Sequence, residues 1–296
     1  MKRTMFKTVK SQETLAAYIL LSPDVLGLLL IYIGPMVFTI YISFLSWTGI
    51  GEKTFVGLEN YLTMFSDPIW LKSLGVTLKY ILLYVPFIAA GSLLLALLTS
   101  IKLPEIKVFR MLYFFPIVVP IIIAAVVWQF IFEPSYGILN YMLGFFGIPA
   151  QPWLGSEKQA LFSVVIISVW KQIGYFMIIY IAGLSDIPTE YYEASLIDGA
   201  NSFQKFLYIT LPLMKPVIVF VLVVNMISAL QDFDQVYVMT RGGPNYATHV
   251  QVFYIYEKAF KFMKMGIASA ASVVLFSIIF LLSLVQLKLY KGGSYE

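Results

Sequence analysis

The 296-residue sequence contains no cysteine and only one histidine, His249. The absence of cysteine excludes disulfide bonds, thiol catalysis and cysteine-based metal sites. One histidine is too few for the usual zinc and haem sites. We therefore expect no catalytic residue and no metal-binding residue in this chain. His249 falls in a loop, and we expect it to lie at the protein surface.

Charged residues are also scarce. They make up 12% of the chain, whereas 60% of the residues are apolar. A soluble domain carries about 25% charged residues, so the polar residues here are too few to cover a water-soluble particle. The composition predicts an integral membrane protein surrounded by lipid. The net charge of +4 bears on orientation in the membrane, and we expect no nucleic-acid partner.

Long apolar runs indicate how the chain crosses the membrane. A bilayer core about 30 Å thick requires roughly 20 apolar residues per helix. Six segments meet this requirement, near residues 15–47, 74–101, 108–132, 160–184, 213–236 and 267–287. The sequence therefore predicts an all-α membrane protein with six transmembrane helices in a single domain, residues 1–296.

The first apolar run follows a basic N-terminal segment, residues 1–14. It is longer than the apolar core of a signal peptide and has no small-residue cleavage site after it. We expect a retained first helix. This helix is long enough either to tilt in the bilayer or to include an interfacial turn around Ser22, Pro23 and Asp24.

Basic residues in short loops predict the orientation. With the N-terminus in the cytoplasm, eleven Lys and Arg residues fall on the cytoplasmic side and seven on the outer side. Lys79 and Lys171 fall inside predicted spans. The bias favours both termini in the cytoplasm.

The cytoplasmic loop at residues 187–216 predicts a helix-turn-helix. Pro188 suits a helix start, and Gly199 stands where a helix ends in a left-handed residue. Asn201 and Gln204 have the spacing of a capping box. From these residues alone, the loop is either an amphipathic hairpin lying against lipid headgroups or a docking site for a partner.

A motif in this loop carries a family resemblance. The loop resembles the conserved "EAA" loop of binding-protein-dependent ABC importer permeases, and only Ser195 departs from that pattern, as one small residue in place of another. The residues at the motif positions are Glu193, Ala194, Ser195, Asp198, Gly199, Ala200, Phe206, Ile209, Leu211, Pro212 and Pro216.

Three further segments extend the resemblance. They are Phe55–Tyr61, Val169–Gly174 and Phe233–Thr240, the last followed by Gly242, Gly243 and Pro244. Each is similar to a segment of the sugar-type permeases of this group. The chain as a whole resembles the glycerol-3-phosphate and oligosaccharide subtype, with a MetI-like transmembrane domain and no large external insertion.

The resemblance implies a type I ABC importer permease fold in the bacterial cytoplasmic (inner) membrane, with the 187–216 loop as the coupling helix. It also implies four partners: two ABC ATPase subunits, a second and non-identical permease, and an extracytoplasmic solute-binding protein that delivers a carbohydrate. ATP and magnesium would be bound by the ATPases, so we expect no cofactor in this chain.

Polar residues at membrane depth are costly and are treated as functional candidates by default. The candidates for a substrate path are Gln129, Trp170, Lys171, Gln172, Asn225, Gln231, Asp232 and Asp234. Structural roles stay open for the same residues. Lys171 can pair with an acidic group or reach towards the interface, Asn225 can join two helices, and tryptophan is common at membrane interfaces.

Two other classes of function fit the sequence less well. The chain has no G-x-x-x-x-G-K-[ST] phosphate-binding loop, so any ATP hydrolysis belongs to a separate subunit. A secondary transporter usually shows inverted repeats and helices interrupted by Gly and Pro at the midplane, and none is clear here. A membrane-embedded enzyme would need clustered His, Asp or Cys at membrane depth, and the sequence offers no such cluster.

Overall fold

The computed structural model describes residues 9–100 and 105–291. Residues 1–8 of the predicted N-terminal segment lie outside the described residues. The described chain forms two compact units. One unit contains the residues up to Met64 together with Lys258–Val273, and the other contains Phe65–Glu257 and the residues from Val274 onward.

The smaller unit consists of a long helical segment and a short two-stranded sheet. Its elements are α1 (Val9–Leu28), a π-helical turn η1 (Leu29–Ile33), α2 (Gly34–Ser43), β1 (Leu45–Ser46), β2 (Thr54–Phe55) and α3 (Glu59–Phe65). The buried Asn60 amide donates to the carbonyls of Ser43 and Leu45, each at 2.9 Å. Asn60 thus ties α3 to the end of α2 and to β1. No turn interrupts α1 at Ser22–Asp24, so that alternative is wrong.

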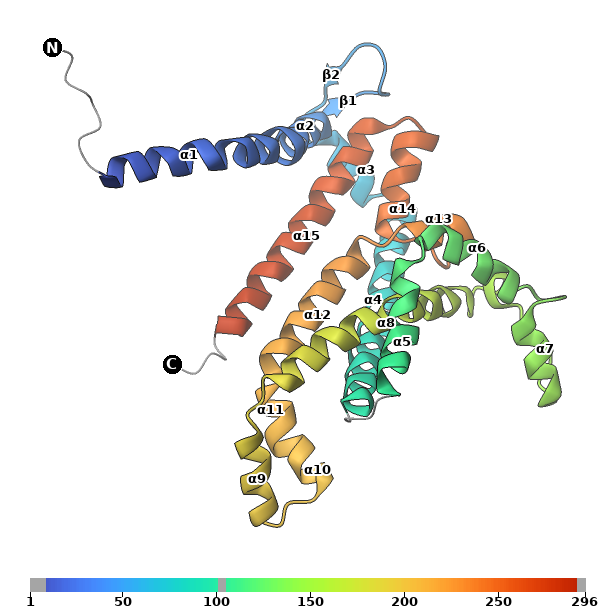
Figure 1. Cartoon of the computed structure of the whole chain (residues 1–296). Coiled ribbons are helices and arrows are strands. Elements are labelled where there is room, and N and C mark those ends of the chain that lie inside the picture. Colours follow the sequence, from blue (N-terminus) through green and yellow to red (C-terminus); the bar gives the residue numbers. More distant parts are fainter. Residues whose placement is uncertain (1–8, 101–104, 292–296) are drawn as a thin grey trace. The chain divides into compact units, whose positions relative to one another are not determined.

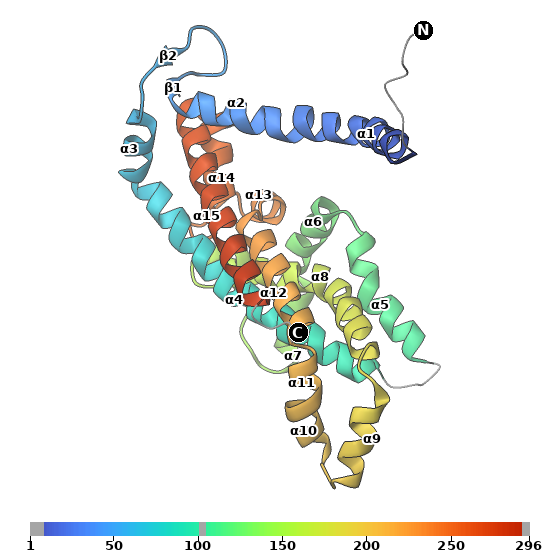
Figure 2. The same ribbon diagram turned by 90° about the vertical axis from the view of Figure 1, so that its left-hand side faces the viewer.

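The larger unit holds most of the helices (Figures 1 and 2). They are α4 (Pro68–Thr99), α5 (Ile106–Val118), α6 (Ile121–Ile131), α7 (Ile138–Phe145), η2 (Trp153–Gly155), α8 (Ala160–Ser185), α9 (Thr189–Ile197), α10 (Ser202–Lys205), η3 (Phe206–Thr210), α11 (Leu211–Leu213), α12 (Lys215–Leu230), α13 (Asp234–Met239) and α14 (Gln251–Tyr256). The last two elements, η4 (Glu257–Lys261) and α15 (Met265–Lys291), contribute residues to both units.

Within residues 9–100 and 105–291, four helices are long and apolar enough to cross a membrane. They are Glu13–Ser43, Pro68–Thr99, Ala160–Ser185 and Met265–Gln286. Two bent helix pairs raise the number to six if each pair counts as one span: α5 with α6, bent by 102°, and Ser202–Leu213 with α12, bent by 66°. The chain is thus a helical protein with four to six candidate spans.

The core of the larger unit lies between α4, α8 and α12. It contains Tyr80, Ile88, Val164, Met177 and Val221, all fully or almost fully buried. Glycine allows one of the closest contacts in this unit. A Cβ added to Gly174 of α8 would lie 1.9 Å from the backbone oxygen of Tyr113 in α5, so only glycine lets the two helices approach this closely.

The loop after α13 folds against the N-terminal end of α4. Tyr254 of α14 donates a hydrogen bond of 3.0 Å to Asp67, the residue that caps α4. Burial, together with this bond, raises the pKa of Tyr254, so its hydroxyl keeps its proton at neutral pH.

His249 lies in the same loop and is only 2% exposed, so the expected surface position is wrong. Its Nδ1 lies 2.7 Å from Ser73 Oγ, and its Nε2 lies 2.8 Å from Glu257 Oε2. The two hydrogen bonds satisfy both ring nitrogens, and this makes burial of the imidazole possible.

We expect Gly174→Ala to force α5 away from α8 and to destabilise the protein by about 1–3 kcal/mol, the usual cost of overpacking a core. The control is Gly75→Ala in α4, where an added Cβ meets nothing within 4 Å. Melting temperatures in one detergent provide the measurement. Equal melting temperatures for the two variants would contradict the close α5–α8 contact.

Candidate functional site

The side chain of Lys171 in α8 binds the C-terminal end of α5. Its ammonium donates to the carbonyl oxygens of Pro116 and Ile117, each at 2.9 Å, and to that of Val119. The C-terminal end of a helix carries partial negative charge and unpaired carbonyls. Lys171 satisfies three of these carbonyls at the point where the chain turns from α5 into α6.

A polar cavity of about 270 Å³ lies beside this contact, and we call it the polar cavity. Side chains from α4, α6, α8, α12 and α13, and from the linker between α12 and α13, line it. They are Tyr80, Tyr84, Ile121, Ser168, Lys171, Gln172, Ser228, Ala229, Asp232, Asp234 and Gln235. Its volume is near the lower end of the range for small-molecule pockets, about 300–1,000 Å³.

Asp232 is the main hydrogen-bond acceptor in the polar cavity. Its carboxylate accepts from the Tyr80 hydroxyl and from the Gln235 side-chain amide. The same amide donates to Ser168 Oγ at 2.9 Å. A carboxylate accepts hydrogen bonds at several lone-pair positions, so this cluster fixes Asp232 in place.

Two stacked tyrosines extend the network from the polar cavity into the core. The rings of Tyr80 and Tyr84 have centroids 5.6 Å apart and planes only 3° from parallel. Tyr84 donates at 3.1 Å to Asn225 Oδ1, and Asn225 Nδ2 donates at 2.7 Å to the carbonyl of Val221. Asn225 is fully buried and supports the cavity through Tyr84 without lining it.

The structure thus brings four of the predicted path residues into one cavity: Lys171, Gln172, Asp232 and Asp234. The other residues lie elsewhere. Gln129 donates to the carbonyls of Val238 and Met239 at the end of α13. Trp170 packs edge-to-face on Trp128, with centroids 5.6 Å apart, in an apolar groove. Gln231 is exposed at the C-terminal end of α12.

The sequence did not single out Tyr80, Tyr84, Ser168 or Gln235 as site residues. A signal was present for the two tyrosines, because their i, i+4 spacing places both hydroxyls on one face of an apolar helix. Gln235 lies within the Phe233–Thr240 segment, beside two carboxylates that were selected. The residues next to Ser168 in the sequence give no sign of a site, and only the fold brings this serine to the cavity.

Residues 187–216 form a helical hairpin, which we call the hairpin. It extends from one end of the α4, α8 and α12 bundle in both views (Figures 1 and 2). Gly199 ends the first arm with φ +73°. Asn201 and Gln204 form both hydrogen bonds of a capping box, at 2.8 and 2.9 Å. The predicted left-handed glycine and capping box are confirmed. Pro188 precedes the first helical residue, Thr189, rather than being it.

One hydroxyl contact joins the two arms of the hairpin, and a second hydroxyl bond lies within the first arm. Tyr192 OH lies 3.0 Å from Thr210 Oγ1, and the buried Ser195 donates at 2.7 Å to the carbonyl of Tyr192. The predicted coupling residues Glu193, Ala194, Asp198 and Gly199 are exposed, while Ala200 and Phe206 are half-buried. The hairpin also exposes Ile197 to 88% and Phe203 to 71%.

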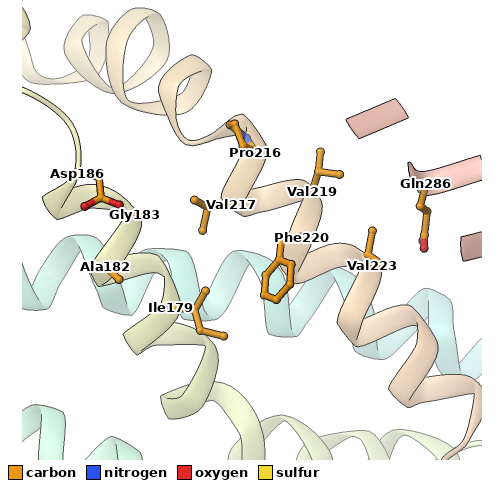
Figure 3. A pocket seen from close by; sticks show the side chains of 10 residues that line it. All are labelled: Ile179, Ala182, Gly183, Asp186, Pro216, Val217, Val219, Phe220, Val223 and Gln286. Carbon is orange, nitrogen blue, oxygen red and sulfur yellow. The ribbon is translucent and has the colours of Figure 1, made fainter. Parts of the chain in front are cut away.

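The hairpin joins the bundle at a close contact between α8 and α12. A Cβ added to Gly183 would lie 2.7 Å from Val217 Cγ2. An apolar groove of about 580 Å³ runs beside this contact and includes Asp186 and Phe220 (Figure 3). Because the two helices pack tightly where the hairpin begins and ends, a force on the hairpin acts directly on both helices.

The chain matches a known family over part of its length and known relatives over nearly its whole length. Residues 106–292 match the family described as "Binding-protein-dependent transport system inner membrane component". The chain is 35% identical over 289 residues to the trehalose/maltose transport system permease protein MalF of Thermococcus litoralis, covering 97% of this chain and 98% of that protein. It is 32% identical to the arabinooligosaccharides transport system permease protein AraP of Bacillus subtilis, covering 100% and 94%.

The fold is also similar to that of a solved structure, a bacterial ABC transporter involved in the import of the acidic polysaccharide alginate. The TM-score is 0.86 at 22% sequence identity, covering 96% of this chain and 98% of the matched chain. A second structure contains that transporter in complex with an alginate pentasaccharide-bound periplasmic protein and has a TM-score of 0.83 at 23% identity.

We expect Lys171→Met to destabilise the protein by about 1.5–3 kcal/mol, the usual contribution of a hydrogen bond to a charged group. The control is Gln172→Leu, because Gln172 also lines the polar cavity but forms no hydrogen bond within the described residues. Thermal unfolding of both variants in detergent is the measurement. A larger loss for Gln172→Leu would mean that Lys171 does not hold the α5–α6 break.

Proposed function

The chain belongs to the family of binding-protein-dependent transport system inner membrane components, and we propose that it is a permease subunit of a carbohydrate ABC importer. The cargo is a sugar, an oligosaccharide or a sugar phosphate. The relatives named for trehalose/maltose and for arabinooligosaccharides support a carbohydrate. The observation that carries the proposal is the exposed hairpin with its EAA-like motif.

The proposed topology has six spans, with both termini in the cytoplasm of a bacterial cell. Counting each bent helix pair as one span supports the number six. The excess of basic residues on one side supports the orientation. In this topology the hairpin lies in the cytoplasm, and both compact units belong to a single permease domain, residues 1–296.

The hairpin is the proposed coupling element. Glu193 and Asp198 are exposed carboxylates, suited to basic groups on an ATPase subunit, and the exposed Ile197 and Phe203 are suited to an apolar cleft. The close contact of Gly183 with Val217 would carry the movement of the hairpin into α8 and α12. ATP and magnesium would bind to the ATPases, and this chain would supply no catalytic group.

The polar cavity is the proposed point of solute contact in this chain. Carboxylate, amide and hydroxyl groups from four helices and from Asp232, which lies between α12 and α13, converge there beside two stacked tyrosine rings. Sugars bind through hydrogen bonds to such groups and through contacts of their apolar faces with aromatic rings. Four of the helices that line the cavity, α4, α8, α12 and α13, meet in the core, so a movement of α8 or α12 changes its shape.

The complete importer would contain this chain, a second and non-identical permease, two ABC ATPases and an extracytoplasmic solute-binding protein. The complex of a structurally similar transporter with its periplasmic protein supports the last partner. The binding protein would deliver the solute to the outer side, and the paired permeases would carry it inward.

We expect Glu193→Ala to lower the ATPase activity stimulated by the loaded binding protein at least tenfold, because the hairpin loses an exposed carboxylate at the proposed contact. Gly199→Ala should lower it about fivefold, since the left-handed conformation costs other residues about 1 kcal/mol or more. The measurement is the ATPase rate of the purified complex, together with the amount of ATPase that co-purifies with this chain.

The matched control for Glu193→Ala is Glu190→Ala, an exposed carboxylate in the first turn of the same helix. It should keep near-normal stimulation. If all three variants stimulate normally, the hairpin does not couple the permease to the ATPase. If the unaltered chain moves a carbohydrate without any ATPase, it is a secondary transporter and the proposal is wrong.

We expect Asp232→Asn to lower solute uptake at least tenfold while leaving binding of the ATPases intact. The amide keeps the shape of the carboxylate but turns one acceptor oxygen into a donor group. Gln231→Ala, one residue away but outside the polar cavity, should retain uptake. The measurement is uptake of a labelled sugar into vesicles. Equal losses of uptake in the two variants would place the substrate path outside the polar cavity.

A further inference from the structure

Three lysines line a groove of about 800 Å³ in the larger unit, on the side that faces outward in the proposed topology. We call it the lysine groove. Lys72 and Lys79 lie seven residues apart on α4, so they occupy one face of the helix about 10 Å apart. Lys158 comes from the segment before α8 and reaches the same groove. The polar cavity contains none of these residues.

The lysine groove carries more positive than negative charge. Its only lining carboxylate is Glu157, so three ammonium groups face one acid. Lys72 donates at 2.7 Å to the carbonyl of Asn245. The side-chain ammonium groups of Lys79 and Lys158 form no hydrogen bond or ion pair within residues 9–100 and 105–291. Both therefore lack a counter-ion from the described chain.

The walls of the groove are apolar and open to the surroundings. Leu82 is 72% exposed, and Phe162 is 44% exposed. Gly75 lies between the two α4 lysines and also lines the groove, and a Cβ added there meets nothing within 4 Å. The groove thus combines apolar side chains with cationic groups.

With the excess length of α4 placed at its outer, N-terminal end, Lys79 lies near the outer boundary of the hydrocarbon core. A helix of 32 residues is about 48 Å long, which exceeds the bilayer hydrocarbon core by about 18 Å. Lys79 follows Pro68 by eleven residues, or about 16 Å of helix. Its flexible side chain extends from the hydrocarbon boundary towards the interface, as lysines near span ends do.

We propose that the lysine groove binds one anionic phospholipid of the outer leaflet. The phosphodiester pairs with the ammonium groups of Lys79 and Lys158, and an acyl chain covers Leu82 and Phe162. A solute would find little hydrogen-bonding surface on these apolar walls, whereas a lipid satisfies both the charge and the apolar area. The choice of leaflet rests on the proposed topology, while the site itself does not rest on transport.

The test is native mass spectrometry of the intact complex, with dioleoyl phosphatidylglycerol and dioleoyl phosphatidylcholine as probes. Lys79→Met should weaken binding of one phosphatidylglycerol about fivefold, and Lys79→Met with Lys158→Met about 25-fold, because each lysine near a membrane surface contributes about this factor. Phosphatidylcholine binding should not change. Lys264→Met, an outward lysine outside the groove, is the matched control and should bind phosphatidylglycerol normally.

Gly75→Phe distinguishes binding at a defined site from diffuse attraction of anionic lipid to the lysines. It places a bulky side chain in the groove and keeps all three lysines. It should also lose phosphatidylglycerol. Retained binding in Gly75→Phe, or equal losses in Lys264→Met and Lys79→Met, would overturn the proposal. If Lys79→Met releases a protein subunit and leaves lipid binding unchanged, a protein carboxylate occupies the groove and the proposal is wrong. Because the readout is lipid binding, failure here is distinct from failure of the proposed transport function.

Discussion

The arrangement of the polar cavity depends on the contact between one ammonium group and the end of one helix. Lys171 holds three carbonyls where α5 stops, and the chain then bends by 102° into α6. From its new direction α6 brings Gln129 to the carbonyls at the end of α13. Since α13 carries Asp234 and Gln235, the position of these two cavity residues depends on a lysine two helices away. A positive charge at the C-terminal end of a helix is favourable, which explains how a charged residue is tolerated in the middle of a span.

In the mechanism that we propose, glycines allow the close helix contacts that carry movement of the hairpin into the bundle. Gly174 allows α5 to touch α8, and Gly183 allows α12 to touch α8. Between them, α8 is fixed on two sides along the half that leads to the hairpin, and the hairpin continues from its end. Interiors packed this closely transmit displacement rather than absorb it. The same helix therefore provides the support for the hairpin and one wall of the polar cavity.

The sequence predicted the features that depend on local chemistry. The left-handed Gly199 and the Asn201–Gln204 capping box needed only a few neighbouring residues, and both are confirmed. The break between α5 and α6 was not predicted, because a continuous apolar run concealed the signal of Pro116 and Pro120. His249 was predicted at the surface because it falls in a loop. Its partners Ser73 and Glu257 come from other elements, and no local pattern reveals such contacts. The cavity gathers Tyr80 and Ser168, 88 residues apart, for the same reason.

The hydrogen bonds already present around Asp232 bear on how firmly the cavity can hold a guest. Tyr80 and Gln235 donate to this carboxylate before any solute arrives. A sugar hydroxyl that takes the place of either donor exchanges a bond within the protein for a bond to the sugar, so the net gain is small. If the cavity is the proposed point of solute contact, such a site would bind weakly and let the solute leave quickly, which conduction through a membrane requires. Discrimination among sugars would then fall mainly to the protein that captures the solute outside the cell.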